Sequence, residues 1–176
     1  MKSPFAEFEA AMSAGLHEMF GAAPDQMPVR AGSPVPSAAD VVIATLGFAA
    51  EHVRGGVTLV ASRASMRGLR PIEFDEGDDA ADCDTLGELA NMLVGRTKTK
   101  ILRRGVVLML GIPVSAIARD VRLKVHSSDP GHVLYAFDHE HGRLYVSLEV
   151  QLDARFTFRD DCVEPQAGAE GDMILF

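Results

Sequence analysis

Residues 84–113 read DTLGELANMLVGRTKTKILRRGVVLMLGIP, and the pattern of this stretch decides the fold and the candidate site. Plotted at about 100° per residue, its apolar side chains gather on one face, which predicts an α-helix packed on a core. The members of this predicted core face are Leu86, Leu89, Ala90, Leu93, Val94, Thr97 and Ile101.

The opposite face of the same helix is polar and carries Asp84, Glu88, Asn91 and Gly95. Glu88 and Asn91 are three residues apart, so they lie one turn from each other and point the same way. Gly95 leaves the next turn without a side chain, which allows another molecule to approach the helix closely. A polar face is typical of any surface helix, so the pair alone does not define a function.

The spacing of four residues around this pair is more specific than the pair alone. Asp84 is followed after three residues by Glu88, after two more by Asn91, and Pro113 stands 22 positions beyond Asn91. This pattern resembles the signature of the CheC/CheX/FliY chemotaxis phosphatases, and most of all its single-site CheX branch. Shared features include Leu86-Gly87 inside the motif, Gly95 after NMLV, the lysines Lys98 and Lys100, and the ending GIP; the detailed likeness runs to about Ile117.

The resemblance implies a phosphatase that hydrolyses the aspartyl phosphate of a CheY-like response regulator. Asn91 is then expected to orient the attacking water, and Glu88 to pair with a lysine of the regulator. The partner-binding residues are expected to be Asp84, Gly95 and Lys98, with Pro113 shaping the structure. The Mg²⁺ belongs to the regulator, so the chain is expected to carry no metal or cofactor of its own.

Two other classes of function remain open. Relatives of this fold in the flagellar switch bind partners without hydrolysis, so a non-catalytic scaffold for a receiver domain is the main alternative. A small-ligand sensor is a weaker one, because it requires a concave apolar pocket. By the same analogy a homodimer is expected, paired through sheet edges. The chain shows no internal repeat, which argues against a two-site architecture.

Composition limits the other possibilities. The chain has 176 residues, 47% hydrophobic and 24% charged, which fits one soluble domain spanning residues 1–176. A net charge of −8 gives no general attraction for nucleic acid. The local exception is a basic patch on the key helix, formed by Arg96, Lys98, Lys100, Arg103 and Arg104. No signal peptide or membrane-spanning run is evident, and two separated cysteines fit reduced cytoplasmic thiols.

The remaining chain predicts an α+β fold, a mostly antiparallel sheet with helices packed on it, CheC/CheX-like in its order of elements. An N-terminal helix region covers residues 1–27, with a cap at Ser3-Pro4 and an end at Gly21. A proline-rich connector covers 28–38. A β-hairpin follows at 40–53 and 56–62, with its turn at Arg54-Gly55-Gly56, and then a small helical or loop piece at 65–71.

The second half begins with an acidic run at 73–82, predicted to be a solvated loop, which makes Asp84 the expected N-cap of the key helix. The nearly uninterrupted apolar run after Gly105 predicts a buried strand. Alternating segments at 121–125, 133–137 and 144–152 predict an antiparallel meander with one face in the core, and 160–176 an irregular tail. His139-Glu140-His141 lies at a predicted hairpin tip, and no metal site is expected there.

Overall fold

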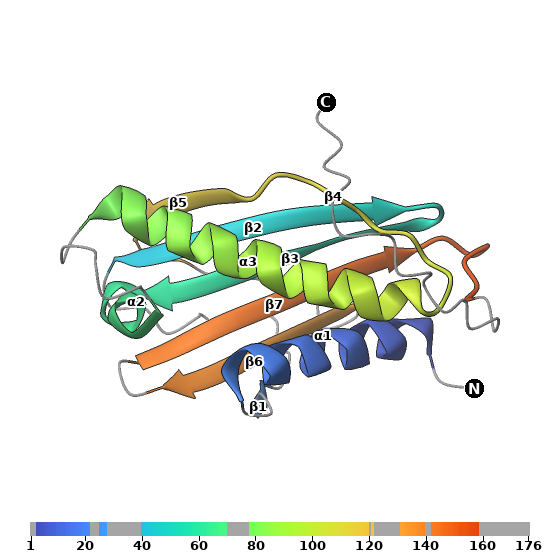
Figure 1. Cartoon of the computed structure of the whole chain (residues 1–176), viewed down its shortest axis with the longest axis horizontal. Coiled ribbons are helices and arrows are strands. Elements are labelled where there is room, and N and C mark those ends of the chain that lie inside the picture. Colours follow the sequence, from blue (N-terminus) through green and yellow to red (C-terminus); the bar gives the residue numbers. More distant parts are fainter. Residues whose placement is uncertain are drawn as a thin grey trace, which may run out of the picture.

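The protein is described by a computed structural model that places residues 3–21, 25–27, 40–69, 78–119, 121, 131–139 and 142–158. Two long helices lie on one face of an antiparallel β-sheet (Figure 1). The elements are α1 (Pro4–Phe20), β1 (Asp25–Met27), β2 (Val41–Ala50), β3 (Val53–Ser62), α2 (Arg63–Leu69), α3 (Asp79–Leu102), β4 (Met109–Leu110), β5 (Val114–Ala118), β6 (His132–His139) and β7 (Gly142–Leu152). The predicted α+β class is confirmed.

Within the described residues the sheet has seven strands in the order β1-β6-β7-β3-β2-β4, and β5 also pairs with β2. β2 and β3 pair along ten residues, from Val41 opposite Ser62 to Ala50 opposite Val53. β3 then pairs with β7, and β7 with β6, all antiparallel. β4 and β5 both lie along the outer side of β2, so they form one edge of the sheet.

The core lies between the sheet and the layer of α1 and α3. α3 crosses the sheet diagonally, with α1 beside it (Figure 1). The predicted core face of α3 is confirmed: Leu86, Ala90, Leu93, Val94, Thr97 and Ile101 are buried, and Leu89 is half-buried. Thr97 satisfies its buried hydroxyl by donating to the carbonyl oxygen of Leu93 at 2.9 Å. α3 therefore packs against α1 on one side and against the sheet beneath it.

The β2–β3 hairpin turns earlier than predicted. Glu51 and His52 make the turn, with His52 at a positive φ of 62°, and Arg54-Gly55-Gly56 lies inside β3. Gly55 is needed for packing instead: a Cβ there would lie 2.4 Å from Cζ of Phe48 and 2.5 Å from the carbonyl oxygen of Glu149. The glycine makes room for an aromatic ring of the core and not for a turn.

The predicted buried strand after Gly105 is also wrong in part. The segment forms only the short strands β4 and β5, and its side chains alternate: Val106 and Leu108 are buried while Val107 and Met109 are exposed. Successive side chains of an extended segment point to opposite faces, and here the face toward the helices is covered while the other meets solvent. Pro113 falls between the two strands.

The C-terminal meander is confirmed in β6 and β7, but both faces of the sheet bury apolar groups. Leu144, Val146, Leu148 and Val150 face the main core, as predicted. On the other face, where polar exposure was expected, Tyr145 and Ser147 are also buried. A second apolar cluster there consists of Val41, Val60, Leu134, Ala136 and Tyr145.

α1 begins after Ser3 with Pro4 in its first turn and ends at Gly21, which adopts φ 70°, as predicted. The Ser3 side chain makes no capping hydrogen bond. The predicted connector at 28–38, most of the strand at 121–125, the tip Glu140-His141 and the tail at 160–176 lie outside the described residues. Among the helices that the structure describes, none is both long and apolar enough to cross a membrane.

Candidate functional site

The helix that carries the candidate site starts earlier than the sequence predicts. Asp78 is the N-cap of α3, and its Oδ1 accepts hydrogen bonds from the backbone N–H groups of Ala80 at 3.0 Å and Ala81 at 3.1 Å. Asp84 is therefore not a cap but an exposed residue in the second turn of the helix. In the described end of the acidic run, Asp78 caps the helix and 79–82 are helical, so this part is not the predicted solvated loop. Several adjacent acids can cap equally well, so the sequence left the choice of cap ambiguous.

The first turns of α3 are fastened to α2 by charge. Asp82 is fully buried, and its Oδ2 lies 3.6 Å from a guanidinium nitrogen of Arg63, which also pairs with Asp79. Beside them, burial and the carboxylates of Asp82, Asp79 and Asp84 raise the pKa of the Cys83 thiol. A raised pKa disfavours the thiolate, which is consistent with Cys83 being an incidental side chain and not a nucleophile.

Glu88 and Asn91 are both exposed on the outer face of α3, as the helical spacing predicts. Within the part of the chain that the structure describes, neither side chain makes a hydrogen bond or ion pair. The backbone beneath them is rigidly held, since Leu86, Ala90 and Val94 on the opposite face are buried. A carboxylate and a carboxamide are thus presented to an incoming molecule with all their hydrogen-bonding capacity available.

Gly87 explains how the site is joined to the sheet edge. It is buried, and a Cβ there would lie 2.9 Å from Oγ of Ser115 and 3.8 Å from Cβ of Pro113. The helix and the β5 edge approach so closely that a side chain at this position would push Ser115 aside. Pro113 therefore packs beside the residue that precedes Glu88. This contact fixes the height of the Glu88 turn above the sheet.

The remaining predicted partner-binding residues lie farther along α3. No atom comes within 4 Å of a Cβ placed on Gly95, so that turn is bare as predicted. Lys98 is half-buried and unpaired among the described residues. Its neighbours in the basic patch are partly neutralised by α1: Lys100 pairs with Glu18, and Arg104 lies 3.3 Å from Glu7.

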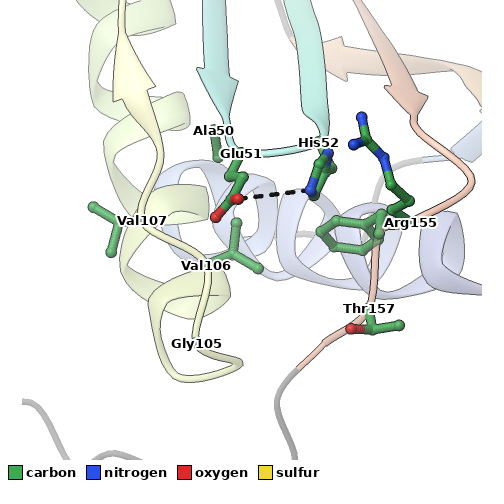
Figure 2. Close-up of a pocket in the computed structure, with 9 residues that line it drawn as sticks. Ala50, Glu51, His52, Gly105, Val106, Val107, Arg155 and Thr157 are labelled. Atoms are coloured by element: carbon green, nitrogen blue, oxygen red, sulfur yellow. Dashed lines mark ion pairs between the residues drawn. The ribbon is translucent and has the colours of Figure 1, made fainter.

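A hollow lies at the end of the sheet that carries the β2–β3 turn. Figure 2 shows the residues that line it, from the β2–β3 turn, the turn after α3 and the segment after β7. Its volume is about 360 Å³. Its lining includes His52 and Glu51, 3.6 Å apart, and Arg155, whose guanidinium binds the Asp153 carboxylate at 3.0 and 3.1 Å. These groups satisfy one another and the lining is polar, so the hollow does not supply the apolar pocket that a small-ligand sensor requires. In the described residues no group of three His, Cys, Asp or Glu side chains could hold a metal.

Comparisons with known proteins agree on the fold. No family model and no curated protein matches the sequence. Among solved structures, a CheC-like superfamily protein from Shewanella sp. PV-4 matches with a TM-score of 0.57 and 19% identity, over 86% of this chain and 99% of that one. A putative chemotaxis protein from Desulfovibrio vulgaris Hildenborough matches with a TM-score of 0.58 and 18% identity, over 83% of this chain and 95% of that one.

The crystal structure of a CheX–CheY–BeF₃–Mg²⁺ complex from Borrelia burgdorferi matches with a TM-score of 0.53 and 18% identity, over 85% of this chain and 98% of that one. The arrangement of two helices on one face of an antiparallel sheet is therefore a known one. It is the fold of the CheC-like and CheX chemotaxis proteins, as the resemblance in residues 84–117 predicts.

Three features of the site escaped the sequence reasoning. Gly87 was part of the motif, but its contact with Ser115 depends on the path of β5. Met92 lies outside the predicted core face and has no predicted role, and Ile112 lies in the predicted buried strand; both side chains are exposed. The signal for Met92 was present, because at 100° per residue it falls 40° from Glu88 and outside the core face.

Proposed function

We propose that this chain is a phosphatase that hydrolyses the aspartyl phosphate of a phosphorylated receiver domain of the CheY type. The observation that carries the proposal is the Glu88 and Asn91 pair, exposed and unpaired among the described residues on a helix that is fixed to its sheet by Gly87. The shared fold with a CheX protein whose complex with CheY has been solved supports the choice of partner.

An acyl phosphate is already activated, so its hydrolysis needs no nucleophile from this chain. It needs a water molecule held in line with phosphorus and a site from which bulk water is excluded. The Asn91 carboxamide is neutral and both donates and accepts hydrogen bonds, so it can orient that water. The Glu88 carboxylate, one turn earlier, pairs with a receiver lysine and sets the distance from Asn91 to phosphorus. The Mg²⁺ is held by the receiver's own acids.

The test follows phosphate release from phosphorylated receivers of the same organism, with Mg²⁺ present. We expect Asn91→Ala to lower kcat by about 10²- to 10³-fold with little change in KM, because it removes the group that positions the water. Asn91→Asp keeps the size but loses the N–H donors, and should be similarly impaired. Glu88→Gln is expected to act mainly through KM. Because both positions are exposed, the free energy of unfolding of each variant should lie within about 0.5 kcal/mol of the wild-type value.

Two results would contradict the proposal. One is a wild-type protein that accelerates phosphate loss from none of the organism's receivers. The other is an Asn91→Ala variant that keeps the wild-type rate. If the wild-type protein binds a receiver without accelerating hydrolysis, the chain is a scaffold.

A further inference from the structure

The cations in the second half of α3 do not all face the same way. Lys100 pairs with Glu18 of α1, which lies along one side of α3 (Figure 1). Arg96 is on that side too, because a Cβ placed on Gly15 of α1 would lie 3.5 Å from the Cβ of Arg96. The hydrogen bond from Lys100 and the charge of Arg96 both lower the pKa of the Glu18 carboxyl. α1 therefore offsets these two charges.

Lys98 lies instead on the line of the helix that carries Asn91. Seven residues are almost two turns, so the two positions differ by only about 20° around α3 and lie about 10.5 Å apart along it. Gly95 stands between them, and no atom comes within 4 Å of a Cβ placed there. Lys98 is half-buried and makes no hydrogen bond or ion pair with the described residues. Of the α3 cations that the structure describes, Lys98 is thus the one that shares the polar face with Asn91.

The spacing of Asn91 and Lys98 fits a phosphoryl group between them. Side chains of a helix are directed toward its N-terminus, so the long stem of Lys98 can reach back over the bare turn of Gly95. A water hydrogen-bonded to Asn91 at about 2.9 Å, phosphorus about 3–3.5 Å beyond it, and a phosphoryl oxygen about 2.8 Å from the ammonium form a chain of about 9–10 Å. Arched outward over Gly95, this chain spans the distance from Asn91 to Lys98.

We propose that Lys98 is a catalytic residue whose ammonium binds the phosphoryl oxygens of the receiver's aspartyl phosphate; this rests on the proposed function. The water oxygen forms a bond to phosphorus, and the bond between phosphorus and the aspartyl oxygen breaks. The receiver keeps its aspartate as a carboxylate, and both protons of the water leave with the phosphate as H₂PO₄⁻. Lys98 stays protonated throughout, and its charge stabilises the negative charge that the phosphoryl oxygens carry in the transition state.

The charges around Asn91 favour this role. A phosphoryl group carries two negative charges, and it approaches Asn91 between the carboxylates of Glu88, one turn away, and Asp84, two turns away. Glu88 also pairs with the receiver lysine in the proposed mechanism, which draws that cation away from the phosphoryl group. A cation two turns to the other side of Asn91 offsets both effects, and Lys98 occupies that position.

The competing role for Lys98 is an ion pair with an acidic side chain elsewhere on the receiver surface. Such a pair would strengthen binding whether or not the receiver is phosphorylated, and it would leave kcat unchanged. A contact with the phosphoryl group instead strengthens binding of the phosphorylated form alone and raises kcat. The two roles therefore differ in their readouts.

The experiment uses Lys98→Met, Lys98→Arg and the matched control Arg96→Met. Both methionine variants remove one positive charge from the same helix and keep an unbranched side chain of high helix propensity, but Arg96 lies on the α1 side. Kd is measured by fluorescence anisotropy for each CheY-type receiver of the organism with Mg²⁺, in the presence and absence of beryllium fluoride, which imitates the phosphoryl group. Release of phosphate from the phosphorylated receiver gives kcat and KM.

We expect Lys98→Met to lower kcat about tenfold, less than the 10²- to 10³-fold effect of a buried oxyanion donor, because Lys98 is only half-buried. The preference of the protein for the receiver loaded with beryllium fluoride should fall about fivefold. Lys98→Arg should stay within about threefold of wild type, since a guanidinium also binds phosphoryl oxygens. Arg96→Met should stay within about twofold in kcat and in that preference.

Two outcomes would overturn the inference while leaving the Asn91 test intact. One is a kcat and a preference for the loaded receiver in Lys98→Met that equal those of Arg96→Met. The other is an equal loss of affinity for the loaded and unloaded receivers with an unchanged kcat, which would assign Lys98 to an ion pair on the receiver surface. If the wild-type protein accelerates phosphate loss from none of the receivers, the proposed function itself fails, and the inference with it.

Discussion

Gly95 offers a test in which stability and function should move in opposite directions. A glycine inside a helix costs about 0.8–1.0 kcal/mol relative to alanine, because the flexible backbone loses more entropy on folding. At Gly95 no atom lies within 4 Å of an added Cβ, so nothing offsets the gain from alanine. We therefore expect Gly95→Ala to raise the free energy of unfolding by about 0.8 kcal/mol and Tm by about 2–3 °C.

The same substitution should impair function if the bare turn receives the partner. Gly95 lies one turn beyond Asn91 on the same polar face, so an added side chain stands between α3 and the receiver. Gly95→Ala is expected to raise KM about threefold, since a methyl group displaces the interface only slightly. Gly95→Gln, also a good helix former, should retain most of the gain in Tm while raising KM at least about tenfold. Thermal denaturation followed by circular dichroism and receiver binding are the two assays.

Gly87→Ala is the matched control for this argument. It brings the same gain in helix propensity, but its Cβ would lie 2.9 Å from Oγ of Ser115, so we expect no rise in Tm. The reasoning is refuted in its functional part if Gly95→Gln binds the receiver as tightly as wild type. It is refuted in its structural part if Gly95→Ala lowers Tm.

Two further predictions concern the start of α3. Asp78→Ala removes the side chain that caps the helix and should lower the free energy of unfolding, measured by urea denaturation, by about 1 kcal/mol. Asp84→Ala, at an exposed position inside the helix, should change it by less than about 0.5 kcal/mol. A larger effect from Asp84→Ala than from Asp78→Ala would place the cap at Asp84. Because the pKa of Cys83 is raised, its thiolate fraction is smaller than that of a free cysteine at any pH below that pKa. In a Cys162→Ser background, Cys83 should therefore react with iodoacetamide more slowly than a cysteine peptide at pH 8, and faster as pH rises; faster alkylation than the peptide would argue for an activated thiol.

The periodicity of apolar residues in the sequence correctly predicted the features that depend on which way a side chain points. The core face of α3 and the exposure of Glu88 and Asn91 follow from the helical repeat alone, whereas the choice of these two residues as the candidate site rests on the resemblance in residues 84–117. The alternation in β7 gave its core face for the same reason. Burial of Tyr145 on the opposite face depends on what covers the sheet there, and periodicity within one strand does not contain that information.

Residue type predicted local structure less well at positions where the same residue can serve two structural purposes. Gly55-Gly56 indicated a turn, but glycine also provides space, and here the ring of Phe48 occupies that space while His52 adopts the positive φ. The apolar run 106–114 indicated burial, but composition does not reveal whether a strand has one neighbour or two. Ile112, between the two short edge strands, is 87% exposed.

The separation of 22 positions between Asn91 and Pro113 has a geometric reason. From Gly87 to the end of α3 at Leu102, fifteen residue steps at about 1.5 Å carry the chain about 23 Å. A tight turn follows, in which Gly105 adopts φ 77° and donates its N–H to the Leu102 carbonyl oxygen at 2.9 Å. From Val106, seven extended steps at about 3.3 Å carry the chain back about 23 Å, which brings Pro113 beside Gly87.

The spacing is therefore the path length of one helix segment and its return along the sheet edge. A residue added to or removed from either limb would shift Pro113 and Ser115 relative to Gly87, and would change the face that the edge presents beside Glu88 and Asn91. On this view the motif specifies two things at once. Glu88 and Asn91 are the residues of the proposed chemistry, and Pro113 marks the point at which the edge has returned far enough to support the turn that carries them.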